Sequence, residues 1–105
     1  MKCHHFGVEI AAQLGIHAAL LFDYVGYWVS QNEDEGQNIR SGVAWVHTTP
    51  MALTVIYPYL SETQIKSALR KLQDAGLIVC GGAVDTTKGR FNAYTLTKKG
   101  EALYY

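Results

Sequence analysis

The 105-residue chain has little cysteine, little proline, no net charge and no long apolar run. Its two cysteines, Cys3 and Cys80, are far apart and lack a CxxC spacing, which argues against a disulfide framework or a zinc knuckle and favours free thiols. No apolar segment approaches the length of a membrane span. The N-terminus MKCHHFGVEIAA carries a lysine and two histidines where a signal peptide has its apolar core. We therefore expect a soluble, cytoplasmic protein without membrane contact.

Metal and cofactor sites are equally poorly supported by the sequence. Cys3, His4, His5 and His17 are possible ligands, but adjacent residues rarely converge on one ion, so an exposed polar N-terminus is the favoured interpretation. The acidic residues 33–35 are consecutive and lack the alternate-position spacing of a calcium loop. We expect no metal and no cofactor.

The sequence also lacks the marks of an enzyme. No Ser/His/Asp, Cys/His or paired-carboxylate arrangement has supporting local context, and GGAVDTTKG does not have the spacing of a phosphate-binding P-loop. His47, beside a pair of threonines, fits a surface position at a strand end better than a general base. We expect a protein that is not an enzyme.

What is present is an ordinary globular composition, 49% apolar and 17% charged. The length suits one domain, 1–105, which we divide into an N-terminal helical segment (1–31), an acidic loop (32–42) and a C-terminal part (43–105).

Charge is distributed unevenly along the chain. Residues 1–60 carry two basic and five acidic side chains, a net charge of −3, whereas residues 61–105 carry seven basic and four acidic ones, a net charge of +3. Such asymmetry would orient an anionic partner toward one face, with binding that is weak and sensitive to salt.

The most informative segment is SETQIKSALRKLQDAGLI, from Ser61 to Ile78. Ser61 and Gln64 form a capping-box pair, which predicts a helix that starts at Glu62, and Gly76 supplies a left-handed stop. Apolar side chains at helical spacing form one buried stripe, Ile65, Ala68, Leu69 and Leu72. The opposite, exposed face is polar and mostly basic, with Thr63, Lys66, Ser67 and Arg70, and Lys71 on its flank.

A helix-turn-helix is predicted around this segment. VAWVH, residues 43–47, reads as a short strand, followed by Thr48 or Thr49 as an N-cap and Pro50 in the first turn of a short helix that runs to about Tyr57. Because Pro58 cannot continue that helix, YPYL is predicted to be the turn that leads into Ser61.

A β-hairpin is predicted after Gly76. LIVC and FNAYTL are the expected strands, and GGAVDTTKGR is a turn-rich connection. Its tip carries Lys88 and Arg90, which suit phosphate or minor-groove contact, although such residues also keep a hairpin edge soluble. The final TKKGEALYY is expected to begin a helix whose aromatic end packs on the long N-terminal helix.

The segment VEIAAQLGIHAALLFDYVGYWVSQN predicts one long amphipathic helix, or two joined at Gly15, with Ile16, Leu20, Tyr24 and Trp28 at helical spacing. Further apolar side chains widen its surface beyond one stripe. Helix 8–31 therefore either forms a homodimer interface or fills the core of the domain, and the sequence does not decide between the two.

Taken together, these elements resemble a winged helix-turn-helix DNA-binding domain of the α+β, mainly α class, with a long N-terminal helix, a three-helix core and a β-hairpin wing. More narrowly, the chain resembles the N-terminal domains of phage and prophage replisome organisers and replication-initiation proteins. Their WV, FPYLS and YxLT pattern matches Trp45, Val46, Tyr57, Pro58, Tyr59, Leu60, Ser61, Tyr94, Leu96 and Thr97. The resemblance implies that helix 62–75 enters the major groove of double-stranded DNA and that Lys88 and Arg90 reach the flanking backbone.

Within that helix, Arg70 is the best candidate for a guanine contact, and Lys66 and Lys71 suit phosphates. Replication initiation, with replication proteins as further partners, is the function that the resemblance implies. Two alternatives remain open, a dimeric transcriptional regulator using the same surface and a protein-interaction scaffold that does not bind DNA.

Overall fold

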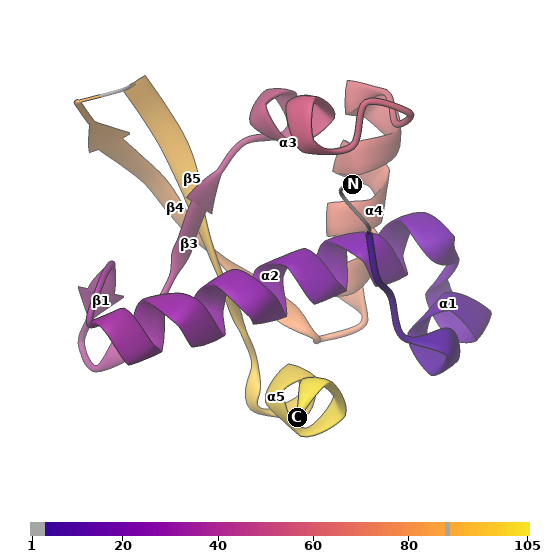
Figure 1. Ribbon diagram of the computed structural model, residues 1–105, viewed down its shortest axis with the longest axis horizontal. Coiled ribbons are helices and arrows are strands. Elements are labelled where there is room, and N and C mark those ends of the chain that lie inside the picture. Colours follow the sequence, from indigo (N-terminus) through magenta and orange to yellow (C-terminus); the bar gives the residue numbers. More distant parts are fainter. Residues whose placement is uncertain (1–3, 88) are drawn as a thin grey trace.

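The computed structural model describes residues 4–87 and 89–105, which form an α+β, mainly helical structure (Figure 1). Within the described residues, no helix combines the length and the apolar character needed to span a membrane. The helices are α1 (Val8–Leu14), α2 (Ile16–Glu35), α3 (Pro50–Ile56), α4 (Glu62–Asp74) and α5 (Lys98–Tyr104), and the strands are β1 (Ile39–Arg40), β2 (Val43–Ala44), β3 (Val46–Thr48), β4 (Ile78–Thr86) and β5 (Gly89–Leu96).

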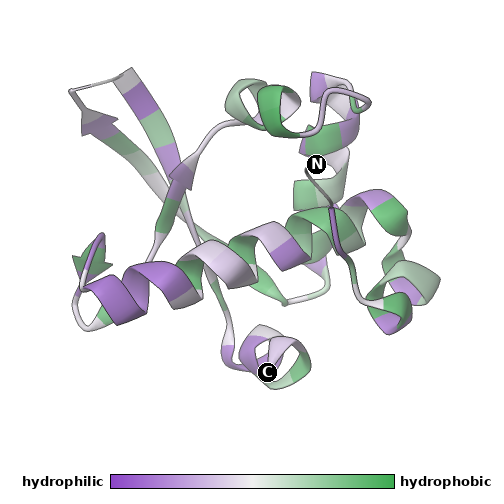
Figure 2. Ribbon diagram, in the orientation of Figure 1, coloured by the Kyte–Doolittle hydropathy of each residue, from purple (hydrophilic) through white to green (hydrophobic). Residues whose placement is uncertain are grey.

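Helix α2 is the central element, and it contacts α1, α4, α5, β2, β3 and β5. In Figure 1, α3 and α4 lie on one side of α2 and α5 on the other. Figure 2 shows that the C-terminal end of α2 is hydrophilic, whereas its first half carries mainly apolar residues. The largest fully buried side chains come from α2, α3 and α4, namely Leu21, Val25, Leu53, Ile65 and Leu72. The core therefore lies where these three helices meet.

The N-terminal segment consists of two helices joined at Gly15, whose φ of +95° breaks the helical path. The four apolar residues at helical spacing do not form one buried stripe, because Ile16 is 55% exposed and Trp28 is 43% exposed. Leu21 and Val25 face the core instead. Apolar side chains cover so much of the surface of α2 that either set could face the core. Spacing alone therefore could not predict which side of the helix is buried.

The prediction that residues 32–42 form an unstructured acidic loop is wrong. Helix α2 continues to Glu35 and ends at Gly36, where φ is +66°. Asn32 is buried, and its side-chain amide donates a hydrogen bond of 2.8 Å to the Trp45 carbonyl. The acidic side chains point to solvent, so they do not prevent the helix from continuing on its buried side.

The expected strand 43–47 is divided at Trp45. β2 pairs with β1 in a short antiparallel hairpin, whose turn places Ser41 and Gly42 at positive φ, a conformation typical of tight hairpins. β3 instead joins a three-stranded antiparallel sheet of order β3-β5-β4, with Val46 opposite Tyr94. The chain therefore leaves one sheet and enters another within six residues.

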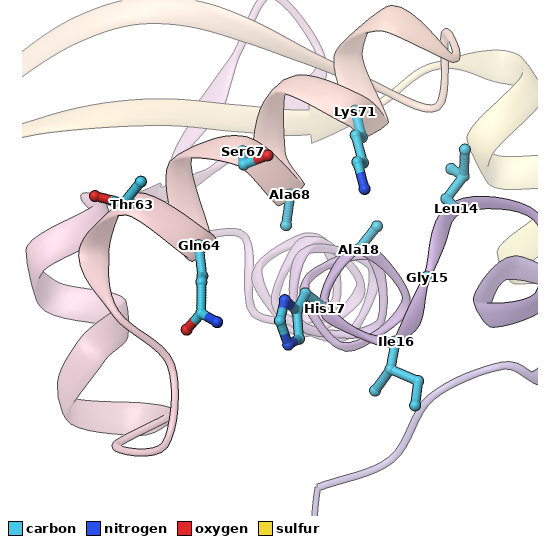
Figure 3. A pocket seen from close by; sticks show the side chains of 10 residues that line it. All are labelled: Leu14, Gly15, Ile16, His17, Ala18, Thr63, Gln64, Ser67, Ala68 and Lys71. Carbon is cyan, nitrogen blue, oxygen red and sulfur yellow. The ribbon is translucent and has the colours of Figure 1, made fainter.

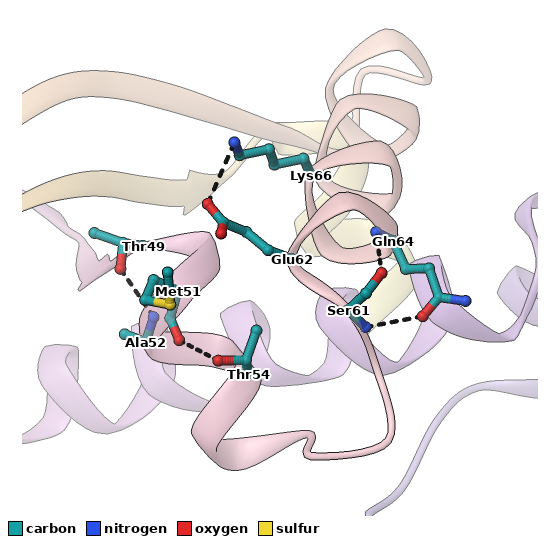
Figure 4. Close-up of polar contacts among 8 residues, drawn as sticks. All are labelled: Thr49, Met51, Ala52, Thr54, Ser61, Glu62, Gln64 and Lys66. Carbon is teal, nitrogen blue, oxygen red and sulfur yellow. Dashed lines mark hydrogen bonds and ion pairs between the residues drawn. The ribbon is translucent and has the colours of Figure 1, made fainter.

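The predicted helix starts at residues 50 and 62 are confirmed (Figure 4). Thr49 caps α3 by accepting a hydrogen bond from the Ala52 N–H at 3.0 Å. Ser61 and Gln64 form the predicted capping box, with hydrogen bonds of 3.1 and 2.9 Å. After α4, Gly76 adopts the left-handed conformation with φ +73°. The predicted stripe of α4 is buried, Ile65, Ala68, Leu69 and Leu72.

Tyr57 attaches the turn between α3 and α4 to the rest of the fold. Its side chain is buried, and its hydroxyl donates to the Leu20 carbonyl of α2 at 3.3 Å. Burial, together with the nearby Asp23 charge, raises the pKa of Tyr57. The hydroxyl therefore stays protonated and holds the start of α4 at a fixed distance from α2.

The β-hairpin is longer than the sequence predicts. β4 runs to Thr86 and β5 begins at Gly89, so most of the expected turn-rich connection is strand. The pairing register between β4 and β5 shifts between Cys80 and Ala83, where Gly81 and Gly82 lie. A Cβ atom at Gly81 would lie 2.6 Å from the Trp45 ring, so the close packing of strand and indole depends on glycine there.

Thr97 caps α5, because its hydroxyl accepts a hydrogen bond from the Gly100 N–H at 3.0 Å. Tyr104 lies edge-on to Phe22 of α2, with ring centroids 6.0 Å apart. The expected packing of the aromatic C-terminal helix on the long N-terminal helix is confirmed.

We predict that Ser61→Ala lowers the free energy of unfolding by about 1 kcal/mol, because the Gln64 N–H loses its acceptor. Urea unfolding monitored by circular dichroism measures the effect. Ser67→Ala makes the same change at an exposed position of α4 and should leave stability unchanged or slightly raised. Equal effects of the two substitutions would contradict the capping role.

Gly100→Ala should destabilise the protein by about 1–3 kcal/mol, because its Cβ would lie 2.0 Å from the Leu77 carbonyl oxygen, a backbone atom. Thermal unfolding measures the change. Glu101→Ala, at the exposed next position, should stay within about 0.5 kcal/mol of the wild type. If the Gly100→Ala variant is as stable as the wild type, α5 is not packed closely against Leu77.

Candidate functional site

The exposed face of α4 brings together five of the residues singled out in the sequence, Thr63, Lys66, Ser67, Arg70 and Lys71. All five are exposed, while the opposite side of the helix is buried against α2 and α3. The capping box fixes where the helix begins, and the buried stripe fixes its rotation. The same residues that stabilise α4 therefore determine which side chains reach solvent.

The charges on this face are partly neutralised. Lys66 pairs with Glu62 one turn earlier, with Nζ 3.3 Å from the carboxylate (Figure 4). Asp74, the last residue of α4, is also exposed. Across residues 4–87 and 89–105, neither Arg70 nor Lys71 takes part in an ion pair. These two cations are the ones most available to an anionic partner.

The two flanks of the α4 face have different neighbours. Since each residue of a helix advances by about 100°, Gln64 and Lys71 lie on one flank and Lys66 on the other. In Figure 4, Lys66 points toward the strands and Gln64 points away from them. In Figure 3, the Lys71 amine points toward the junction of α1 and α2.

A cleft of about 540 Å³ lies along the second flank. Its α4 side carries Thr63, Gln64, Ser67, Ala68 and Lys71, and its other side carries Leu14, Gly15, Ile16, His17 and Ala18 (Figure 3). Three of the predicted site residues thus share one cleft with His17. This cleft was not predicted, because His17 and Lys71 are distant in the chain and belong to helices whose packing no local pattern reveals.

The remaining predicted site residues are Lys88 and Arg90. Arg90 is on β5 and pairs with Asp85 across the hairpin, with 3.8 Å between Nε and Oδ1 and both side chains largely exposed. Lys88 lies outside the described residues. In Figure 1, the start of β5 and α4 are on opposite sides of the view. The structure gathers the five helix residues on one surface and keeps Arg90 apart from them.

A second small cleft, of about 210 Å³, lies between the β1–β2 hairpin and the sheet. The Arg40 guanidinium stacks 5.1 Å from the centroid of the Trp45 ring, and Arg40, Trp45 and His47 line the cleft. Among the described residues, the Trp45 indole nitrogen is buried without a hydrogen-bond partner. This pairing was missed because the segment around Arg40 was predicted to be a loop.

Metal ligands are not assembled in the part of the chain that the structure describes, where no group of three or more His, Cys, Asp or Glu side chains could hold an ion. Cys3, one of the ligands considered in the sequence, lies outside the described residues. Cys80 is an exposed free thiol.

Comparisons of the chain with protein-family models, with curated proteins and with solved structures gave no match.

The Lys66–Glu62 pair should contribute less than about 0.5 kcal/mol to stability, because both side chains are substantially exposed. A double-mutant cycle with Glu62→Gln and Lys66→Gln, measured by urea unfolding, tests this. A coupling energy above about 1 kcal/mol would mean that the pair is structural. Lys66 would then be less available to a ligand than its exposure implies.

Proposed function

We propose that the chain is a winged helix-turn-helix domain that binds double-stranded DNA in replication initiation of the phage, prophage or plasmid type. The observation that carries the proposal is the solvent-facing basic side of α4, with Arg70 and Lys71 free of ion pairs among the described residues. The order α2, β3, α3, α4, β4, β5 and the antiparallel arrangement β3-β5-β4 support a helix-turn-helix followed by a wing.

A helix with its side chains is about 10–12 Å wide, and the major groove of B-DNA is about 12 Å wide, so α4 can enter the groove along its exposed face. Arg70, near the centre of that face, is the candidate for a bidentate contact to guanine. Lys66 and Lys71, on the two flanks, suit phosphates, and the Thr63 and Ser67 hydroxyls can contact either base edges or backbone. Lys88 and Arg90 of the hairpin are assigned to the flanking backbone.

The role in replication rests on the resemblance of the Trp45–Val46, YPYLS and YTLT segments to replication-initiation domains. In that role the protein acts in the cytoplasm, is not an enzyme, and has replication proteins as further partners.

A dimeric transcriptional regulator is the second candidate, favoured by exposed aromatic side chains on α2. Tyr27 is 49% exposed and Trp28 is 43% exposed, and their rings meet edge-on with centroids 5.3 Å apart. Aromatic side chains are enriched in protein interfaces. This pair lies within the predicted 8–31 dimer surface.

A protein-interaction scaffold is the third candidate. Helix α3 exposes Met51 (62%) and Val55 (81%), and Tyr59 in the following turn is 58% exposed. An apolar surface of this kind, together with zero net charge, would suit a protein partner better than DNA.

Fluorescence anisotropy with a labelled random-sequence duplex, titrated at low and then rising salt, tests the proposal. The wild type should bind, and the Lys66→Ala/Arg70→Ala variant should bind at least about tenfold more weakly with a shallower salt dependence, since fewer counterions are released. Arg40→Ala/Lys98→Ala removes the same charge from β1 and α5 and should have a much smaller effect. Absence of binding at the lowest salt would overturn the proposal in favour of the scaffold.

A further inference from the structure

We propose that the cleft between the start of α2 and α4 holds one phosphodiester strand of the bound duplex, and that His17 contacts a phosphate there. This inference rests on the proposed function and extends the DNA-contacting surface to a second helix. His17 was considered in the sequence only as a metal ligand.

The first argument is geometric. A helix that fills the major groove has one sugar–phosphate strand along each of its flanks, because the two strands form the walls of the groove. One flank of α4 carries Lys66 and faces the strands of the protein (Figure 4). The other carries Gln64 and Lys71 and opens into the cleft of about 540 Å³. A strand on that flank therefore passes between α4 and the first turn of α2.

The second argument is electrostatic. Lys71 and His17 line the cleft from different helices, and both side chains are exposed (Figure 3). No acidic side chain is among the ten residues that line it. The other polar groups, from Thr63, Gln64 and Ser67, are neutral hydrogen-bonding groups of the kind that contact phosphates. The polar side of the cleft therefore suits an anion, whereas Leu14, Ile16 and Ala18 line the rest with apolar groups.

The third argument is the contrast with the opposite flank. There Lys66 is already paired with Glu62, at 3.3 Å. Lys71 has no such competitor among the described residues, so a phosphate in the cleft displaces no ion pair. We expect the strand in the cleft to be held more firmly than the strand beside Lys66.

Charge substitutions at His17 test this inference in the same anisotropy titration. His17→Lys should tighten binding about three- to tenfold at 0.15 M salt and steepen the slope of log K against log salt by about 0.9, the value for one more neutralised phosphate. His17→Glu should weaken binding by a similar factor. Gln31→Lys and Gln31→Glu are the matched controls, because Gln31 lies on the same helix about 21 Å away. They should change affinity by less than about twofold at 0.15 M salt, where the Debye length is about 8 Å.

The outcomes separate the two proposals. If the His17 variants behave like the Gln31 variants while Lys66→Ala/Arg70→Ala still weakens binding, the duplex does not reach the cleft and this inference is wrong, but the proposed function stands. If the wild type does not bind DNA even at the lowest salt, both are wrong. Thermal unfolding checks that the variants are folded, and if His17→Glu is destabilised, the His17→Lys result decides.

Discussion

The burial of α2 is the constraint on which the other elements depend. This helix contacts α1, α4, α5, β2, β3 and β5, and Ala19 and Leu21 are completely buried in it. The packing of α4 against α2 therefore determines which face of α4 is exposed to solvent. Ile65 and Leu72 must reach the core that α2 builds, and Tyr57 bonds the preceding turn to the Leu20 carbonyl. A change in the packing of α2 would rotate or move the surface to which we assign DNA binding.

Local sequence signals were reliable where the physics is local. The capping pair Ser61–Gln64, a threonine cap at Thr48 or Thr49 before Pro50 and the stop at Gly76 all predicted helix ends correctly, because each depends on hydrogen bonds or dihedral angles within a few residues. The exposure of Lys66 and Arg70 followed from the same reasoning, since one buried stripe fixes the opposite face.

The errors and omissions come from contacts between distant parts of the chain. Helix α2 continues through the acidic segment that was predicted to be a loop. The Asn32 amide there donates a hydrogen bond to the Trp45 carbonyl, a partner that no local pattern reveals. The rotation of α2, and with it the exposure of Ile16, is decided by what packs on either side. The cleft between His17 and Lys71 exists only because α1 and α2 meet at Gly15 beside α4.

The C-terminal segment completes the hydrogen bonds of the turn that follows α4, which has a consequence for the order of folding. The Thr97 hydroxyl donates to the Gly76 carbonyl, the Thr97 N–H to Leu77 and the Lys99 amine to Ala75. These acceptors leave the ribosome some twenty residues before their donors. During synthesis, α4 can form completely by local folding, because its N-terminal cap and the carbonyls of its last turn both find partners within residues 61–77. The turn 75–77 that follows the helix gains its remaining hydrogen bonds only when residues 97–99 have emerged and β5 has paired with β4.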